Sequence, residues 1–178
     1  MFAIPIMAQK RAFTIDDLYK IKTVSDPQFS PDGRRIAFVV SESLLHEGSS
    51  HSHIYICDVD GSNLKILTNT ASRDTDPRWA GDGMSIYFLS TRKAGKQLWQ
   101  IPIDGGEPTQ ITSLAMEVSD PVLTPGGDGF VFSTDVYPEC GADDKANKIL
   151  LDQCYTCEEE RSKRLDLPLT PRPTGALQ

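Results

Sequence analysis

Three times this chain carries a variant of one short stretch, and the first copy reads Asp26-Pro27-Gln28-Phe29-Ser30-Pro31-Asp32-Gly33-Arg34-Arg35-Ile36-Ala37-Phe38. The second copy aligns with it without a gap and reads Asp76-Pro77-Arg78-Trp79-Ala80-Gly81-Asp82-Gly83-Met84-Ser85-Ile86-Tyr87-Phe88. The third reads Asp120-Pro121-Val122-Leu123-Thr124-Pro125-Gly126-Gly127-Asp128-Gly129-Phe130-Val131-Phe132. Because a fixed internal repeat indicates that one structural unit recurs along the chain, this pattern predicts more about the fold than any single motif.

A second element repeats between these copies, and its two occurrences comprise residues 54–61 with 64–68 and residues 98–105 with 108–112. His53 to Phe88 maps onto Gln97 to Phe132 at a constant offset of 44 residues. The first copy instead lies 50 residues before the second. We assign the extra six residues of the first unit to a polar loop from Ser41 to His53.

Each unit reads as four short strands. The first strand ends at Phe29, Trp79 or Leu123, and the others are expected at residues 36–40 and 86–89, 54–57 and 98–101, and 65–68 and 109–112. A four-stranded unit that repeats every ~40–45 residues is typical of a β-propeller blade. A solenoid repeat is usually shorter or helical, and a β-sandwich has no reason to keep such a register.

We assign structural rather than chemical roles to the residues that the copies share. Pro31 presets φ at the first corner of a turn, and Gly33 suits its exit. Asp26, Asp76 and Asp120 recur with the repeat, so we interpret them as turn or inter-blade hydrogen-bonding groups rather than as ligands. The full structural motif comprises Asp26, Pro27, Phe29, Pro31, Asp32, Gly33, Asp76, Pro77, Trp79, Asp82, Gly83, Asp120, Pro121, Pro125 and Gly127.

The predicted fold class is all-β. We expect an incomplete β-propeller of about two and a half four-stranded blades, with a short N-terminal helix capped by Thr14 and an irregular or helical C-terminal tail. A propeller closes with ~4–8 blades, so 178 residues should leave open blade faces and an association-prone molecule that resembles part of something larger. The predicted regions are a leader remnant or disordered segment (1–9), a helical arm (10–24), the blades (25–138) and a partly disordered tail (139–178).

Charge and hydropathy exclude several classes of partner. The formal net charge of −7 argues against nucleic acid and anionic lipid, both of which require a basic face. The apolar stretch from Met1 to Ala8 is too short to span a membrane and has no basic residues before it. It fits the end of a leader peptide or an unstructured terminus. We therefore expect a periplasmic or secreted protein if the parent gene completes the leader, and otherwise a cytoplasmic one.

The cysteines and histidines do not predict a metal or cofactor. Cys154 and Cys157 form a single C-x-x-C pair, whereas a structural zinc site usually needs two such pairs. In an exported protein, a disulfide from Cys140 to Cys154 or to Cys157 is plausible. The three histidines, which are His46, His51 and His53, fall in the predicted polar loop, where we expect solvent exposure. We predict no metal site and no cofactor.

The Asp-Pro-x-Phe-Ser-Pro-Asp-Gly pattern resembles the WD40-like propeller repeat of the Tol-system periplasmic protein and of prolyl oligopeptidase-family serine peptidases. Residues 11–19 and 132–140 look specifically like the acylaminoacyl-peptidase or dipeptidyl-peptidase branch. In that family the propeller caps a C-terminal α/β-hydrolase domain with a Ser, Asp and His triad and restricts access to small peptides. The resemblance implies that the partners of this chain are the rest of the propeller and the hydrolase domain, and that peptides are substrates only of the intact enzyme.

No catalytic residue is predicted in this chain. It contains no Gly-x-Ser-x-Gly elbow and no histidine after His53, and Ser30, Ser85 and Ser133 lie in blade turns or strands. Glu158 to Glu160 fit a solvated charge run paired with nearby basic residues. We therefore expect the non-catalytic propeller portion of a serine peptidase. The alternatives are a free-standing protein-binding module of the Tol-system type, and a truncated product without function.

Overall fold

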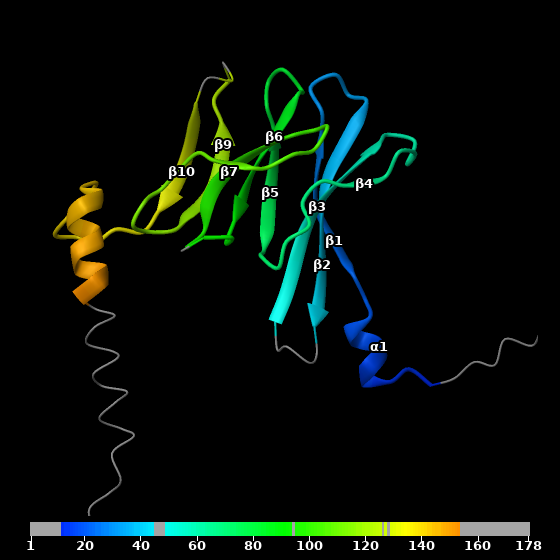
Figure 1. Cartoon of the computed structure of the whole chain (residues 1–178), viewed down its shortest axis with the longest axis horizontal. Coiled ribbons are helices and arrows are strands. Elements are labelled where there is room, and N and C mark those ends of the chain that lie inside the picture. Colours follow the sequence, from blue (N-terminus) through cyan, green and yellow to red (C-terminus); the bar gives the residue numbers. More distant parts are fainter. Residues whose placement is uncertain (1–11, 45–48, 94, 126, 128, 154–178) are drawn as a thin grey trace, which may run out of the picture. The chain divides into compact units, whose positions relative to one another are not determined.

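The computed structural model describes residues 12–44, 49–93, 95–125, 127 and 129–153. In this part of the chain, one short helix and ten strands follow one another (Figure 1). They are α1 (Ile15–Tyr19), β1 (Thr23–Phe29), β2 (Arg35–Leu44), β3 (Ser49–Asp58), β4 (Lys65–Ile66), β5 (Asp74–Trp79), β6 (Ser85–Ser90), β7 (Gln97–Pro102), β8 (Thr109–Gln110), β9 (Val118–Leu123) and β10 (Phe130–Thr134). A further helical stretch covers residues 144–153.

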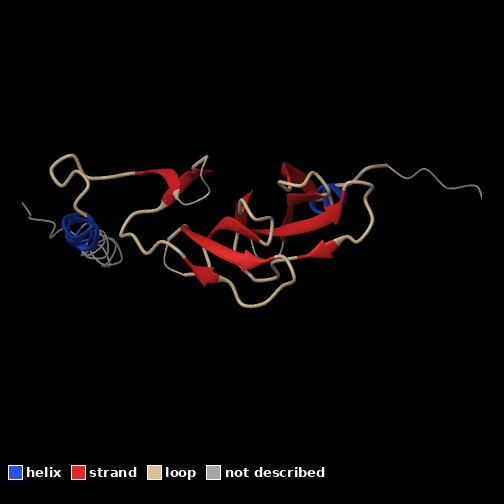
Figure 2. Ribbon diagram, turned by 90° about the horizontal axis from the view of Figure 1, so that it is seen from above, coloured by secondary structure: helices blue, strands red, loops and turns tan. Residues whose placement is uncertain are grey.

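The strands form three antiparallel sheets in which neighbours in sequence are neighbours in space. Blade 1 has the order β1-β2-β3-β4, blade 2 has the order β5-β6-β7-β8, and blade 3 consists of β9 and β10. The registers of blades 1 and 2 agree, because Phe38 lies opposite Tyr55 just as Phe88 lies opposite Trp99. Strands and their loops make up almost all of this region (Figure 2). The predicted all-β, incomplete propeller of about two and a half blades is confirmed.

The predicted polar loop from Ser41 to His53 is wrong, because most of it extends the β2–β3 hairpin. His51 lies opposite Glu42, and His53 lies opposite Val40. Ser41 and Ser52 lie opposite each other in this hairpin, and their hydroxyl groups form a hydrogen bond with the two Oγ atoms 2.9 Å apart. The residues at these positions are almost all polar, so no apolar alternation marks a strand, yet the backbone ladder of the hairpin continues without a break to Leu44 and Ser49. His51 and His53 are half-buried rather than exposed, and His46 lies outside the described residues.

The core lies between blades rather than inside one. A sheet has two faces, and alternate residues of each strand point to opposite sides. We call the side of blade 2 that carries Trp79, Ile86, Phe88, Trp99 and Ile101 its leading face. The side of blade 1 that carries Ala37, Ile54, Ile56 and Leu67 is its trailing face. These buried residues form one hydrophobic cluster, which we call the seam.

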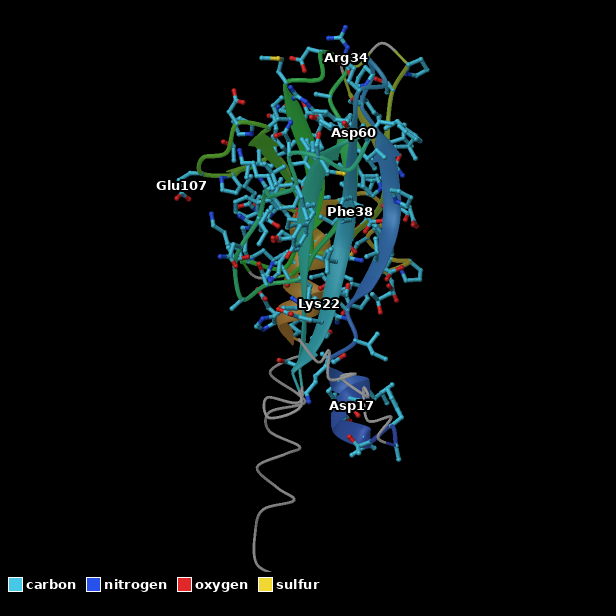
Figure 3. All side chains as sticks on the ribbon, turned by 90° about the vertical axis from the view of Figure 1, so that its right-hand side faces the viewer. Asp17, Lys22, Arg34, Phe38, Asp60 and Glu107 are labelled. Carbon is cyan, nitrogen blue, oxygen red and sulfur yellow. The ribbon has the colours of Figure 1, made fainter. Side chains whose placement is uncertain are left out.

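The opposite side of blade 1 has no blade against it among the described residues. Phe38 lies on this side (Figure 3). It stacks on Tyr55, with ring centroids 5.8 Å apart. Phe29 occupies the repeat position of Trp79, yet 64% of Phe29 is exposed while Trp79 is 7% exposed. The same register position is thus buried or exposed according to whether a preceding blade is present.

The chain separates into two compact units. Unit 1 holds the blades up to Ser133, and unit 2 holds Leu114–Met116 with the chain from Thr134 onward. In unit 2 the Asn147 side chain is 2% exposed, and its amide nitrogen donates to the backbone oxygens of Gly141 and Asp143. The helical stretch at residues 144–153 lies in the tail that was expected to be irregular or helical, and residues 154–178 lie outside the described residues. No helix among the described residues is long and apolar enough to cross a membrane.

We expect Trp79→Ala to lower the free energy of unfolding by about 3–5 kcal/mol, because it leaves a cavity in the seam. The matched control is Phe29→Ala at the equivalent position of blade 1, which should change stability by less than about 1 kcal/mol. Urea unfolding of both variants measures the difference. Equal losses would contradict a core that lies between the blades.

Candidate functional site

The three copies of the repeat form turns of the same geometry around a shared glycine, which follows an aspartate in the first two copies and a glycine in the third. Gly33, Gly83 and Gly127 adopt φ values of 68°, 67° and 72°, a region that glycine enters without steric cost. Each glycine N–H donates to the backbone oxygen three residues earlier, at 2.9 Å for Gly33, 2.9 Å for Gly83 and 2.8 Å for Gly127. Pro31 and Pro125 occupy exposed corners of the first and third turns. These motif residues therefore close the first hairpin of each blade.

The aspartate of each of the first two turns accepts a backbone hydrogen bond. Asp32 Oδ1 accepts from the Arg34 N–H at 3.1 Å, and Asp82 Oδ1 accepts from the Met84 N–H at 2.9 Å. Ser30 Oγ also donates to Asp32 Oδ1 at 2.6 Å. The Ser30 hydroxyl, followed by the Arg34 N–H, holds the pKa of Asp32 below its usual range. Asp32 is therefore a fixed carboxylate of the turn.

The Asp-Pro motifs share one backbone conformation, and the first two lie at bulges. Asp26, Asp76 and Asp120 adopt φ values of 47°, 54° and 49°, a left-handed region that aspartate tolerates better than most residues. The β1–β2 and β5–β6 registers shift across these positions. The prolines that follow, Pro27, Pro77 and Pro121, have no N–H to donate, so a bulge suits them.

Asp26 joins blade 1 to blade 2. Its Oδ2 accepts from Arg78 Nη1 at 2.8 Å, and its Oδ1 accepts from Gln28 Nε2 at 2.7 Å. Trp79 Nε1 donates at 2.9 Å to the backbone oxygen of Gln28, which lies two residues after Asp26. Asp120 instead accepts from Ser133 Oγ at 3.1 Å within blade 3. The structure thus places Asp26 and Asp76 at bulges, and Asp26 makes an inter-blade hydrogen bond.

A buried ion pair was not anticipated from the sequence. Asp74 is 0% exposed, and both of its carboxylate oxygens accept from Arg92 Nη2 at 3.0 Å. The Arg92 guanidinium also lies 5.0 Å from the ring centroids of Phe88 and of Trp99. One signal could have revealed the pair, because Asp74 occupies the repeat position where the other copies carry Val24 and Val118. An acid at a buried valine position needs a cationic partner.

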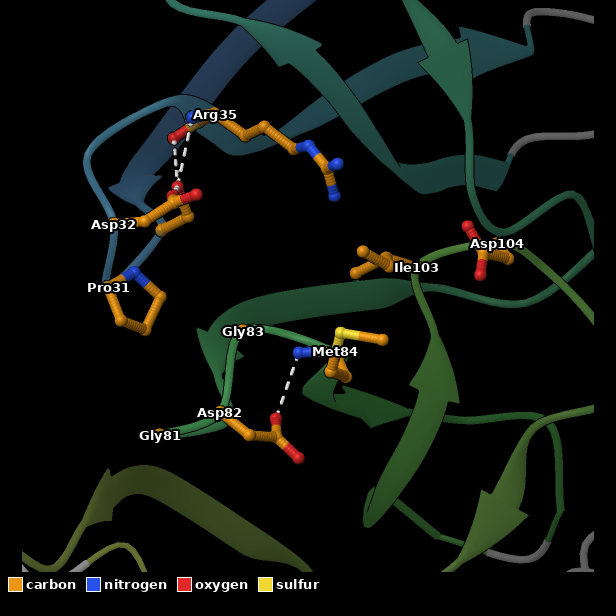
Figure 4. A pocket seen from close by; sticks show the side chains of 10 residues that line it. Pro31, Asp32, Arg35, Gly81, Asp82, Gly83, Met84, Ile103 and Asp104 are labelled. Carbon is orange, nitrogen blue, oxygen red and sulfur yellow. Dashed lines mark hydrogen bonds between the residues drawn. The ribbon is translucent and has the colours of Figure 1, made fainter.

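A pocket of about 510 Å³ lies between the first two turns (Figure 4). Its lining comprises Ser30, Pro31, Asp32, Arg35, Gly81, Asp82, Gly83, Met84, Ile103 and Asp104. The only hydroxyl among these residues is that of Ser30, which is engaged with Asp32 and with the Arg35 N–H. No histidine lines the pocket to act as a base. The pocket therefore offers hydrogen bonds and charge, but no activated nucleophile.

The other candidate groups are also engaged in structure. Ser85 Oγ accepts from Gln100 Nε2 at 2.8 Å, so it is an ordinary polar residue of the sheet. Cys57 and Cys140 are free thiols, while Cys154, Cys157 and the charge run from Glu158 to Glu160 lie outside the described residues. Within the described ranges, no group of three or more histidine, cysteine, aspartate or glutamate side chains is placed to hold a metal ion.

We expect a double-mutant cycle of Asp26→Asn and Arg78→Met to give a coupling energy of about 0.5–1 kcal/mol at low salt, because the pair is only partly exposed. The coupling should shrink at about 1 M salt, where the Debye length is about 3 Å. The control cycle combines Asp120→Asn with Arg78→Met and should be additive. A coupling that is zero at every salt concentration, or equal in both cycles, would contradict the inter-blade contact.

Curated relatives of this chain include peptidases. It is 33% identical over 137 residues to the uncharacterised peptidase YuxL of Bacillus subtilis, a match that covers 76% of this chain and 21% of the relative. It is 24% identical over 129 residues to dipeptidyl-peptidase 5 of Porphyromonas endodontalis, covering 72% of this chain and 19% of the relative. The chain thus spans about a fifth of the length of each of these two relatives.

A solved structure and a family model agree with the fold. The uncomplexed acylaminoacyl peptidase of Pyrococcus horikoshii superposes with a TM-score of 0.50 at 20% identity, over 67% of this chain and 20% of that protein. The model of the PD40 TolB beta propeller domain matches residues 15–143, which is most of the chain. The repeated turns, the two four-stranded blades and this match lead to one conclusion: the chain belongs to the TolB beta propeller domain family.

Proposed function

We propose that this chain is the non-catalytic propeller portion of a serine peptidase of the prolyl oligopeptidase family. In the intact enzyme it limits which peptides reach an α/β-hydrolase site. The observation that carries the proposal is the match of the chain to about a fifth of the length of peptidases, over the propeller repeats. The lack of a Gly-x-Ser-x-Gly elbow in the sequence supports a role without catalysis in this part.

The packing between blades supports a role in size selection. A domain that excludes large substrates must keep its shape. Protein interiors resist deformation because they are packed as densely as crystals of small organic molecules. The seam supplies such packing through Trp79, Phe88 and Trp99, and the Asp26–Arg78 contact fastens its edge. Blades 1 and 2 therefore form a rigid pair. In a closed propeller, such rigid pairs would keep the opening through which peptides enter narrow.

The purified chain should not hydrolyse aminoacyl or acyl-dipeptide chromogenic substrates above the buffer rate, because it offers no nucleophile with an adjacent base. The measurement is a colour-release assay with and without a serine-directed fluorophosphonate. A mock purification from cells without the gene controls for contaminating peptidases. Turnover that exceeds the mock preparation and is abolished by the fluorophosphonate would contradict the proposal.

In the longer protein read from the gene beyond codon 178, we expect Arg78→Met to relax size selection. Loss of the contact with Asp26 loosens the edge of the seam, so the ratio of kcat/KM for a long peptide over a short one should rise several-fold. The control is Lys22→Met, which removes an exposed charge away from the seam. An unchanged ratio in an active Arg78→Met enzyme would contradict gating by this pair of blades.

A free-standing protein-binding module remains the second candidate, because the matching family model is named after TolB. The gene sequence separates the two. A hydrolase domain in frame after codon 178 supports the peptidase, whereas a stop codon without any downstream hydrolase favours the module. In the second case the chain should act through a protein partner rather than on peptides.

A further inference from the structure

We propose that the bond between Asp104 and Gly105 is a site of covalent self-modification, at which the chain forms isoaspartate. The Gly105 backbone nitrogen loses its proton and attacks the side-chain carbon Cγ of Asp104, and one water leaves as a five-membered succinimide ring closes. Water then reopens the ring. Where it breaks the bond from the nitrogen to the former backbone carbonyl, the peptide link runs through the side chain. This inference goes beyond the proposed function, because it concerns the chemistry of one turn.

Asp-Gly pairs occur five times in the chain, and glycine matters because no side chain shields its backbone nitrogen. The last pair, at residues 128 and 129, begins outside the described residues. In the four described turns, the glycine N–H donates to the backbone oxygen three residues earlier, at 2.9 Å for Gly33, Gly61 and Gly83 and at 3.0 Å for Gly105. This shared bond does not distinguish the four sites, so their surroundings must.

Three of the four carboxylates are tied to the backbone. Asp60 Oδ1 accepts from the Ser62 N–H at 2.9 Å and from Ser62 Oγ at 2.6 Å, and Asp32 and Asp82 likewise accept from the N–H two residues later. These bonds must break before Cγ can reach the next nitrogen. The reaction also needs a protonated carboxyl, since the oxygen leaves as water. The Ser62 hydroxyl, followed by the Ser62 N–H, lowers the pKa of Asp60, so this carboxyl is protonated less often.

The Asp104 carboxylate is exposed and untied. Within the residues that the structure describes, it has no hydrogen-bond or ion-pair partner. Figure 4 shows the contrast, because a dashed line joins Asp82 to the Met84 nitrogen and none reaches Asp104. A second glycine follows, and Gly105 and Gly106 adopt φ values of 97° and 125°. Two glycines let the turn change shape without steric cost, so Cγ can approach the nitrogen.

A lysine of the neighbouring blade activates the nitrogen that attacks. Lys65 Nζ donates to the Asp104 backbone oxygen at 2.8 Å and to the Ile103 backbone oxygen at 3.1 Å. The Asp104 oxygen belongs to the same amide as the Gly105 nitrogen. A cation on this oxygen stabilises the negative charge that develops as the N–H proton leaves, as donors do in an oxyanion hole. In the other three described turns, no lysine or arginine side chain binds the aspartate's backbone oxygen.

The same lysine favours the product. After rearrangement, the former backbone carbonyl carbon of Asp104 carries a free carboxylate, and the Lys65 ammonium already lies beside it. Lys65 belongs to blade 1 and Asp104 to the β7–β8 turn of blade 2, so the reaction lengthens the backbone by one methylene where the two blades touch. The arrangement depends on blades 1 and 2 alone and on no further part of a propeller.

The test incubates the whole chain for weeks at neutral pH and body temperature. Peptide mapping with electron-transfer fragmentation distinguishes isoaspartate from aspartate at each site. Asp104 should accumulate isoaspartate several-fold faster than Asp32, Asp60 or Asp82, because only its carboxyl is free and only its amide contacts a lysine. Equal rates at the four sites, or a faster reaction at one of the other three, would overturn the proposal.

Two variants examine the role of the lysine. Lys65→Met should slow the reaction at Asp104 several-fold and leave Asp32 unchanged, whereas Lys65→Arg keeps a cation and should retain most of the rate. Lys93→Met removes an exposed charge from blade 2 and is the matched control, with no change expected. A Lys65→Met chain with native circular dichroism that reacts as fast as the unchanged chain would contradict assistance by Lys65.

Denaturation separates the structure from the local sequence. In concentrated urea the hydrogen bonds that tie Asp32, Asp60 and Asp82 are lost, and so is the contact of Lys65 with Asp104. The rates at the four sites should then converge, and Lys65→Met should have no effect. A preference for Asp104 that stays the same in urea would show that its sequence alone causes it and would overturn the inference. The order of the four sites in the folded, unchanged chain decides the matter even if Lys65→Met does not fold.

Discussion

A sheet of four short strands cannot bury either of its faces by itself, and the rest of this structure depends on that constraint. Blade 2 buries its leading face only because blade 1 offers a trailing face of matching shape. Trp79 makes the dependence visible, since it lies in blade 2 but packs in a cluster with Ala37 and Ile54 of blade 1. Stability here is therefore a property of pairs of blades, and a blade at the end of the row has only half of its packing.

The polar groups follow the same constraint. Asp74 could not be buried in the leading face of blade 2 without Arg92, whose guanidinium also covers the rings of Phe88 and Trp99. Asp26 lies in a bulge that turns its carboxylate toward Arg78 of the next blade. The Asp-Gly turns close hairpins, so they form the edge of the structure rather than a reactive centre. The polar groups of the described residues thus stabilise the turns and the contact between blades.

The repeat predicts the sheets well, because its turns and its alternating strands carry local information. It predicts the length of the β2–β3 hairpin poorly. The serines and histidines between residues 41 and 53 are typical of a loop, whereas in the structure Ser41 and Ser52 pair across the hairpin. The sequence of a single segment also does not predict which residues of another blade a side chain contacts. Arg78 and Arg92 look like ordinary surface cations, and only the contact with a distant strand or a buried acid gives them a role.

The distance in sequence between partners across the seam has a consequence for folding kinetics. Trp79 and Gln28 are 51 residues apart, Arg78 and Asp26 are 52 apart, and Lys65 reaches the backbone oxygen of Ile103 over 38 residues. Each of these contacts closes a loop of about one repeat. The entropy of loop closure therefore stays nearly constant as blades are added, and docking of blade 2 on blade 1 is a natural nucleus. Amide hydrogen exchange should then be slowest in the strands beside the seam and fastest toward the outer strands of the row.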